Sequence, residues 1–133
     1  MRFLLDTNIC IYAMKNRPPE VLERFRAVGK EAVAVSVITV LELRQGAEKS
    51  QKPVQNHAAL DLFLGPIRIL PFDEEAALCG ARVRADLERR GCPIGDLDSL
   101  IAAHALALDL TLVTNNLSEF ERVSRLKTEN WVD

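Results

Sequence analysis

Five short apolar runs separated by longer segments of helical periodicity are the feature that most constrains the fold of this 133-residue chain. The runs span residues 2–6, 32–36, 67–71 and 111–115, with a weaker one at 126–131. The segments between them predict helices over 18–30, 38–51, 56–65, 73–91 and 96–110. Strands that alternate with helices predict an α/β fold with a mostly parallel sheet. We therefore expect residues 1–133 to form a single domain around a mostly parallel five-stranded sheet.

The composition argues for a soluble, cytoplasmic protein. The longest apolar-leaning run, residues 32–41, is half the length of about 20 residues that a membrane-spanning helix needs. The three cysteines have no close C-x-x-C spacing, so we interpret them as reduced thiols. The chain carries 17 Lys and Arg against 19 Asp and Glu. That balance neither favours nor excludes nucleic acid as a ligand, because a local basic patch is sufficient to bind it.

A carboxylate stands at the end of the first predicted strand, where an apolar residue would be expected. Asp6 follows Phe3 to Leu5 directly, and an unpaired carboxylate is costly to bury. In open parallel sheets, ligands bind outside the carboxyl ends of the strands. Asp6 is therefore a candidate site residue, although it could equally cap a helix that begins near Asn8.

Further acids occur at corresponding places in the chain. Glu42 lies in the helix after the second strand, and Asp96 and Asp98 begin the apolar helix 96–110. Asp96 and Asp98 are about 200° apart around a helix, so we expect Asp96 to be the N-cap and Asp98 to face a site. Alternatively, Glu42 is a surface acid and Asp98 a second capping residue.

Carboxylates from separate segments that meet at one sheet edge would repel one another unless a cation lies between them. The candidate ligands are carboxylate oxygens, and oxygen-only ligands suit Mg²⁺ or Mn²⁺ rather than zinc. Such ions commonly act on phosphates, where they activate water and neutralise phosphoryl charge. The acids therefore favour a phosphodiester or phosphate substrate.

Four motifs and their order carry a resemblance to a known family. They are FLLDTNICIY, ITVLEL, PIGDLDSLIAAHALAL and LVTNNLSEFERV, followed by a terminal ENW. Together they resemble the PIN-domain ribonucleases, and more closely the VapC toxins of type II toxin–antitoxin modules. The resemblance implies a three-layer α/β/α sandwich and a metal-dependent endoribonuclease that leaves a 5′-phosphate and a 3′-hydroxyl.

The resemblance also implies roles for individual residues. Asp6, Glu42 and Asp98 match the catalytic, metal-binding acids, with Mg²⁺ or Mn²⁺ as cofactor. The expected supporting residues are Thr7, Asn8, Asp96, Thr114 and Asn116. Many PIN domains have a fourth acid where this chain has Asn116, and Asp96 or Glu119 could compensate for it. We interpret His104 as a packed structural residue.

Partners and substrate follow from the same resemblance. It implies a homodimer inhibited by a VapB-type antitoxin whose tail fills the site groove. The implied substrate is structured RNA: the anticodon stem-loop of a tRNA, with initiator tRNA as the narrower expectation, so that cleavage inhibits translation. The basic candidates for holding RNA are Lys15, Arg17, Arg44, Lys49 and Lys52.

Three other interpretations remain open at this stage. A non-catalytic RNA- or protein-binding PIN-like domain is the main alternative, and Asn116 is its support. A DNA or flap-type nuclease would usually be a larger chain. A phospho-acceptor receiver domain would need a pair of acids early in the chain, but Asp6 has no acidic neighbour.

Overall fold

The computed structural model describes residues 1–132 and contains one five-stranded sheet in which every pairing is parallel. The strands are β1 (Phe3–Leu5), β2 (Val33–Ser36), β3 (Arg68–Leu70), β4 (Thr111–Val113) and β5 (Thr128–Glu129). They are arranged in the order β3-β2-β1-β4-β5. The chain therefore reverses its direction of progress across the sheet at β1, with β2 on one side and β4 on the other.

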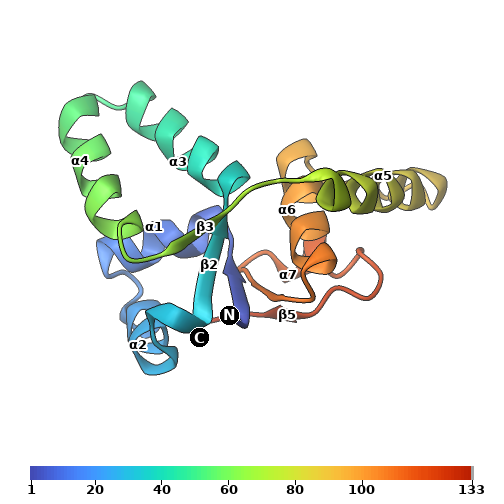
Figure 1. The fold of residues 1–133 in the computed structure, drawn as a ribbon, viewed down its shortest axis with the longest axis horizontal. Coiled ribbons are helices and arrows are strands. Elements are labelled where there is room, and N and C mark those ends of the chain that lie inside the picture. Colours follow the sequence, from blue (N-terminus) through green and yellow to red (C-terminus); the bar gives the residue numbers. More distant parts are fainter. Residues whose placement is uncertain (133) are drawn as a thin grey trace.

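Helices fill the connections between the strands. Those before β3 are α1 (Thr7–Lys15), α2 (Pro19–Val28), α3 (Val37–Lys49) and α4 (Pro53–Leu64), with a short 3₁₀ turn, η1, at Lys30–Ala32. The later ones are α5 (Glu74–Arg89), α6 (Asp96–Ala107) and α7 (Leu117–Phe120). Figure 1 shows α1, α2 and α4 on one side of the sheet and α5 and α6 on the other.

Alternate side chains of the central strand enter two separate cores. Phe3 and Leu5 pack with residues of α1 to α4, whereas Leu4 packs with residues of α5 and α6. Because successive residues of a strand point to opposite faces, one buried strand serves both layers. The expected α/β/α sandwich with a five-stranded sheet is confirmed, and the sheet is entirely rather than mostly parallel.

The ends of the chain differ in detail from the sequence-based expectations. The fifth strand is limited to Thr128–Glu129, but Trp131 beyond it packs edge-on against Phe3 with 5.4 Å between ring centroids. Helix α1 begins at Thr7, immediately after the first strand, as the capping interpretation of Asp6 requires. Within residues 1–132, no helix combines the length and apolar character needed to cross a membrane.

The reversal of strand order at β1 marks the place where a ligand site is expected. In open parallel sheets the crevice forms beyond the carboxyl ends of the strands at such a switch point. Asp6 directly follows β1, and Thr114 directly follows the neighbouring β4.

Candidate active site

Asp6 serves both of the roles considered for it. Its Oδ1 accepts a hydrogen bond of 2.9 Å from the Ile9 backbone N–H, so it caps α1. The side chain is also nearly inaccessible, with 6% of its surface exposed, and it is hydrogen-bonded by Thr114. Burial raises the pKa of Asp6, the Thr114 and backbone hydrogen bonds lower it, and the charge of Glu42 raises it. Capping therefore leaves Asp6 within the electrostatic reach of a second acid.

Glu42 reaches the same place from α3. The Thr7 hydroxyl donates a hydrogen bond of 2.7 Å to Glu42 Oε1, which ties the first turn of α1 to the second turn of α3. Thr7 follows Asp6 in the chain, so this single contact brings the acid after β1 beside the acid after β2.

Asp98 lies on the first turn of α6, opposite Glu119 of α7. Asp98 is within hydrogen-bonding reach of the Glu119 carboxyl group, and this contact raises the pKa of Asp98. Burial, then the charge and hydrogen bond of Glu119, and then the charges of Glu42 and Asp6 raise the pKa of Asp98 to about 7. Four acids from four segments therefore repel one another at one edge of the sheet. We call Asp6, Glu42, Asp98 and Glu119 the acid cluster.

Glu119 is held in place by groups that lie on both sides of it. Its Oε1 accepts a hydrogen bond of 2.8 Å from the Gly95 backbone N–H, and its Oε2 accepts one of 2.5 Å from Asn116 Nδ2. A Cβ atom on Gly95 would lie 3.2 Å from Asp98 Oδ2 and 3.6 Å from Glu119 Oε1. The absence of a side chain at Gly95 thus permits both acids to approach the start of α6.

Thr114 and Asn116 support the acids from the loop after β4. Thr114 is fully buried, it is hydrogen-bonded to Asp6, and its Oγ1 accepts a bond of 3.0 Å from the Asn116 N–H. Asn116 in turn orients Glu119. The position where many PIN domains carry an acid is therefore occupied by an amide that holds the acid three residues later. Asn8 is exposed at the start of α1.

The acid cluster has the character of a divalent cation site. Its donors are carboxylate oxygens only, and a cation between them would offset both the burial and the repulsion that raise the pKa of Asp98. Within residues 1–132, no three Asp, Glu, His or Cys side chains already surround a common point at ligand distance. Mg²⁺ keeps several of its waters and needs only one or two carboxylates, so the open arrangement fits this ion.

Comparison with known proteins gives the family. The model of the PIN domain matches residues 3–126. The chain is 46% identical over 131 residues to the tRNA(fMet)-specific endonuclease VapC of Shigella flexneri, with 98% of both chains covered. It is 48% identical over 133 residues to ribonuclease VapC2 of Haemophilus influenzae, with 99% of both covered. The chain belongs to the VapC ribonucleases of the PIN-domain family.

Solved VapC structures have the same fold. The chain superposes with a TM-score of 0.93 on a chain of DNA-bound VapBC from Salmonella typhimurium, at 42% identity and 98% coverage of both chains. It superposes with a TM-score of 0.91 on a chain of VapBC2 from Rickettsia felis bound to a promoter DNA fragment. The two chains are 39% identical, and the match covers 98% of this chain and 99% of the other. The expected family and the endoribonuclease class are thereby confirmed.

One expectation about the start of α6 is wrong. Asp96 is not the N-cap, because the first helical hydrogen bond runs from the Ser99 N–H to the Gly95 carbonyl, which makes Gly95 the cap. The Asp96 side chain is 85% exposed and pairs with Arg84 of α5 at 3.1 Å. Glu119, the other candidate for a compensating acid, is the one that lies beside Asp98.

His104 of α6 is a packed residue, as expected. It is 1% exposed, its Nδ1 lies 2.8 Å from Ser36 Oγ, and its ring meets Phe72 edge-on at 5.3 Å. Burial lowers the pKa of His104, with smaller opposing effects from Asp73 and the Pro71 carbonyl. It therefore stays neutral and is not part of the acid cluster.

The basic candidates occupy different environments. Arg44 of α3 is held by α4: Nη1 bonds the His57 carbonyl and lies 3.1 Å from His57 Nδ1, and Nη2 pairs with Asp61 at 2.6 Å. Lys49 and Lys52 lie at the α3–α4 connection, which projects away from the sheet in Figure 1. Lys15 is at the end of α1, and Arg17 follows it in an exposed turn.

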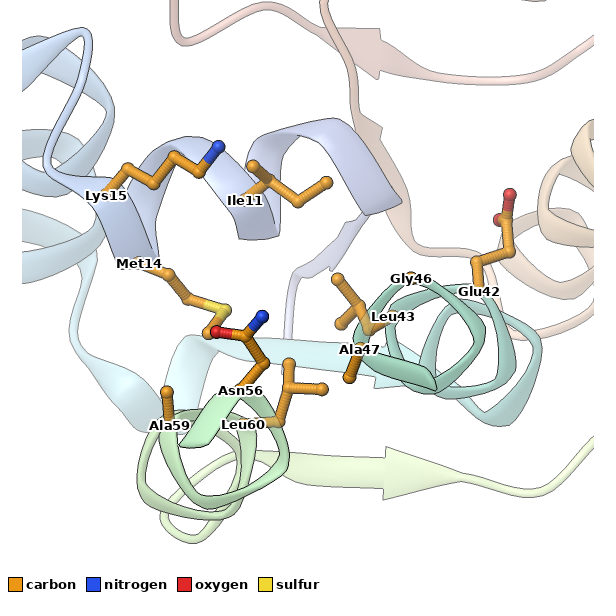
Figure 2. A pocket seen from close by; sticks show the side chains of 10 residues that line it. All are labelled: Ile11, Met14, Lys15, Glu42, Leu43, Gly46, Ala47, Asn56, Ala59 and Leu60. Carbon is orange, nitrogen blue, oxygen red and sulfur yellow. The ribbon is translucent and has the colours of Figure 1, made fainter. Parts of the chain in front are cut away.

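A groove of about 390 Å³ lies beside the acid cluster. Figure 2 shows it between α1, α3 and α4, with Glu42 and Lys15 at opposite ends. Between them it is lined mainly by apolar side chains, including Ile11, Met14 and Leu43. The groove of this VapC chain is therefore apolar along its length and charged at its ends.

Proposed function

We propose that this VapC ribonuclease is a Mg²⁺- or Mn²⁺-dependent toxin that cleaves a structured RNA and so inhibits translation. The observation that carries the metal dependence is the acid cluster, in which burial, and then the neighbouring acids Glu119, Glu42 and Asp6, raise the pKa of Asp98 to about 7. The substrate we infer is a tRNA cut in its anticodon stem-loop, with initiator tRNA as the narrower assignment. Two relatives, 46% and 42% identical, bear the name tRNA(fMet)-specific endonuclease VapC, which supports it.

Each acid has a distinct place in the proposed chemistry. Asp6, Glu42 and Asp98 hold the cation, with Glu119 as a fourth acid beside Asp98. When bound there, the cation supplies Lewis-acid stabilisation of the phosphoryl oxygens and lowers the pKa of a coordinated water. Thr7 fixes the orientation of Glu42, and Thr114 that of Asp6. Asn8 stands exposed beside Thr7, where it can contact the substrate.

Phosphate contacts are assigned to the basic residues around the groove and the α3–α4 connection. Lys15 lies at the groove end opposite Glu42, and Arg17 follows it. Lys49 and Lys52 would contact the backbone farther from the acids. Arg44 already donates to α4 and can use only its remaining donors. We expect these cations to contribute affinity that falls with salt.

The groove supports inhibition by a VapB-type antitoxin. Solved structures similar to this chain are described as VapBC complexes. An amphipathic helix binds by laying its apolar side chains in such a groove, and a basic residue at its end would meet Glu42. The occupant would then cover the acid cluster from the α3 side.

We also propose a homodimer, as the family resemblance implies. Large apolar side chains are exposed on α3 and α5, with Val37 41%, Leu41 51% and Leu78 53% accessible, and they are candidates for the contact between the two copies. Light scattering of the purified chain measures this directly.

The deciding experiment compares Asp6→Asn with Asp73→Asn. Both residues cap a helix in the same way, since Asp73 Oδ1 accepts a bond of 3.0 Å from the Ala76 N–H at the start of α5. Asparagine is also a good N-cap, so both variants should fold. We expect the wild type and Asp73→Asn to cut total tRNA at discrete positions with Mg²⁺ and not with EDTA, and Asp6→Asn to leave it intact. Equal cleavage by Asp6→Asn would refute the assignment.

The alternative of a non-catalytic RNA- or protein-binding PIN-like domain is not favoured by the contacts of Asn116. It depended on Asn116 in place of an acid, and Asn116 instead holds Glu119 against Asp98. Intact tRNA with folded, Mn²⁺-loaded wild type would restore it.

A further inference from the structure

Three neutral polar side chains form a hydrogen-bonded row beside the acid cluster. Asn115 Nδ2 lies 3.5 Å from the Tyr12 hydroxyl, and Asn130 Nδ2 lies 3.3 Å from Asn115 Oδ1. The row joins α1, the loop after β4 and the segment after β5, which are far apart in sequence. We call Tyr12, Asn115 and Asn130 the amide row. It contains no charged group.

Residues of the amide row are adjacent in the chain, or on the same helix, to residues that contact the acid cluster. Asn115 directly follows Thr114, which is hydrogen-bonded to Asp6. Tyr12 lies on α1, the helix that Asp6 caps. Asn8, one turn before Tyr12 on the same helix, is exposed, and Tyr12 is partly exposed. An RNA whose phosphate lies at the acids would therefore pass its neighbouring nucleotides close to this row.

A backbone group sets the direction of the hydrogen bonds. The Val132 N–H can only donate, and it lies 2.9 Å from Asn130, so the oxygen of that amide faces it. The Asn130 nitrogen must then donate to Asn115 Oδ1, and the Asn115 nitrogen must donate to the Tyr12 oxygen. Among residues 1–132, no acceptor is recorded for the Tyr12 hydroxyl hydrogen.

The hydrogens that remain point to one kind of ligand. Tyr12 keeps its O–H, and Asn115 and Asn130 each keep a second N–H, so all three side chains still offer a donor. A guanine presents two adjacent acceptors, O6 and N7, whereas adenine presents N7 beside a donor amino group. Single-stranded loops leave these base edges accessible to protein side chains.

We propose that the amide row selects the RNA by binding the O6 and N7 edge of an unpaired guanine next to the cleaved phosphate. This inference rests on the proposed ribonuclease function. The Tyr12 hydroxyl and the Asn115 amide are the specificity-determining groups, and Asn130 orients Asn115. Because the row is uncharged, it distinguishes bases and leaves the phosphates to the lysines and arginines.

The test uses the full-length chain, Mn²⁺ and RNA hairpins with one loop guanine. That guanine is replaced by inosine, which keeps O6 and N7, by 7-deazaguanine, which lacks N7, or by adenine. For the wild type we expect kcat/KM unchanged with inosine and about tenfold lower with 7-deazaguanine or adenine. Tyr12→Phe removes only the hydroxyl, and it should cut the guanine hairpin more slowly and discriminate little between the four bases.

A matched control and a second measurement separate the possible explanations. Gln55→Ala removes an exposed amide of α4 and should keep the wild-type preference. Binding of the same hairpins to Asp6→Asn and to the double variant with Tyr12→Phe, in EDTA, tests the row without cleavage. If Tyr12→Phe keeps the preference, or weakens all four hairpins equally as a phosphate contact would, the inference is overturned. A wild type that never cuts would refute the proposed function, and the binding measurement would still decide the row.

Discussion

Asp98 is the residue whose proton most directly reports the state of the acid cluster. Its pKa is raised to about 7, whereas the unfolded chain releases the proton near 3.8. The folded, metal-free protein therefore binds more protons between these values, and its stability falls as pH rises from about 4 to 7. We expect Asp98→Asn to match the wild type at pH 4 in EDTA. At pH 8 it should be more stable by about 1–2 kcal/mol, after discounting for solvent screening of a half-exposed carboxyl.

Urea unfolding at a series of pH values measures this difference. Asp96→Asn is the control, because Asp96 lies on the same turn but is exposed and pairs with Arg84. It should change the free energy of unfolding by under about 0.5 kcal/mol at every pH. A pH-independent gain for Asp98→Asn would show that repulsion within the cluster is not its cause.

Two fully buried threonines differ in whether their hydroxyl groups have hydrogen-bond partners. In the described residues, Thr39 Oγ1 of α3 has no hydrogen-bond partner, whereas Thr114 is bonded to Asp6 and to the Asn116 N–H. We expect Thr39→Val to raise the free energy of unfolding by about 0.5–1 kcal/mol, since it removes an unsatisfied buried hydroxyl. Thr114→Val should lower it by about 1–3 kcal/mol. Chemical denaturation of both variants tests this, and a loss in Thr39→Val would reveal a partner such as a water.

The start of α6 is where a single element controls the geometry of the acids. The backbone of Gly95 has φ −54° and ψ 149°, which any residue adopts, so Gly95→Ala should fold with near-normal stability. Its Cβ would lie 3.2 Å from Asp98 Oδ2, so the Asp98 carboxylate would have to shift by a few tenths of an ångström, whereas Glu119 Oε1 at 3.6 Å would remain in ordinary contact. We expect Mn²⁺ affinity, measured by calorimetry, to fall about tenfold, with a matching loss of cleavage.

Gly46→Ala on α3 is the control for this substitution. A Cβ at Gly46 meets no atom within 4 Å, so that variant should bind Mn²⁺ as the wild type does. Unchanged affinity in Gly95→Ala would mean that the close approach at the start of α6 does not position the acids.

The elements show where sequence reasoning works and where it fails. The apolar periodicity predicted α2 to α6 to within a few residues, because each must bury one face. The cap of α6 was misplaced by one residue, because aspartate is a better cap than glycine by propensity. In the structure Gly95 is the cap and its N–H donates to Glu119, a tertiary contact that local propensity does not include. The short α7, which carries Glu119, has too few residues to produce a periodic signal.

At the scale of the whole molecule, the sequence predicts that the acids meet at one edge of the sheet. It does not predict the shape of the surfaces around them. Asp6 and Glu42 each follow the carboxyl end of a strand, and the parallel sheet brings those ends to one edge. The amide row requires Asn130 to lie beside Asn115, which depends on how β5 pairs with β4. The groove likewise depends on the angle between α3 and α4, for which the sequence carries no local pattern.

Metal binding should stabilise the entire fold in a pH-dependent way. A ligand that binds only the folded state at ten times its Kd adds about 1.4 kcal/mol, or about 4–6 °C in Tm for a chain of this size. We expect this shift with Mn²⁺ at pH 8 and a much smaller one at pH 5.5, because below pH 7 a cation must displace the proton that Asp98 carries when its pKa is raised to about 7. Differential scanning calorimetry of EDTA-treated protein measures the shift at both pH values.

Asp73→Asn should respond as the wild type does, because residue 73 lies outside the acid cluster and the asparagine oxygen can still accept the capping hydrogen bond from the Ala76 N–H. Asp6→Asn should show almost no shift at either pH, and a shift equal to that of the wild type would place the cation elsewhere on the molecule.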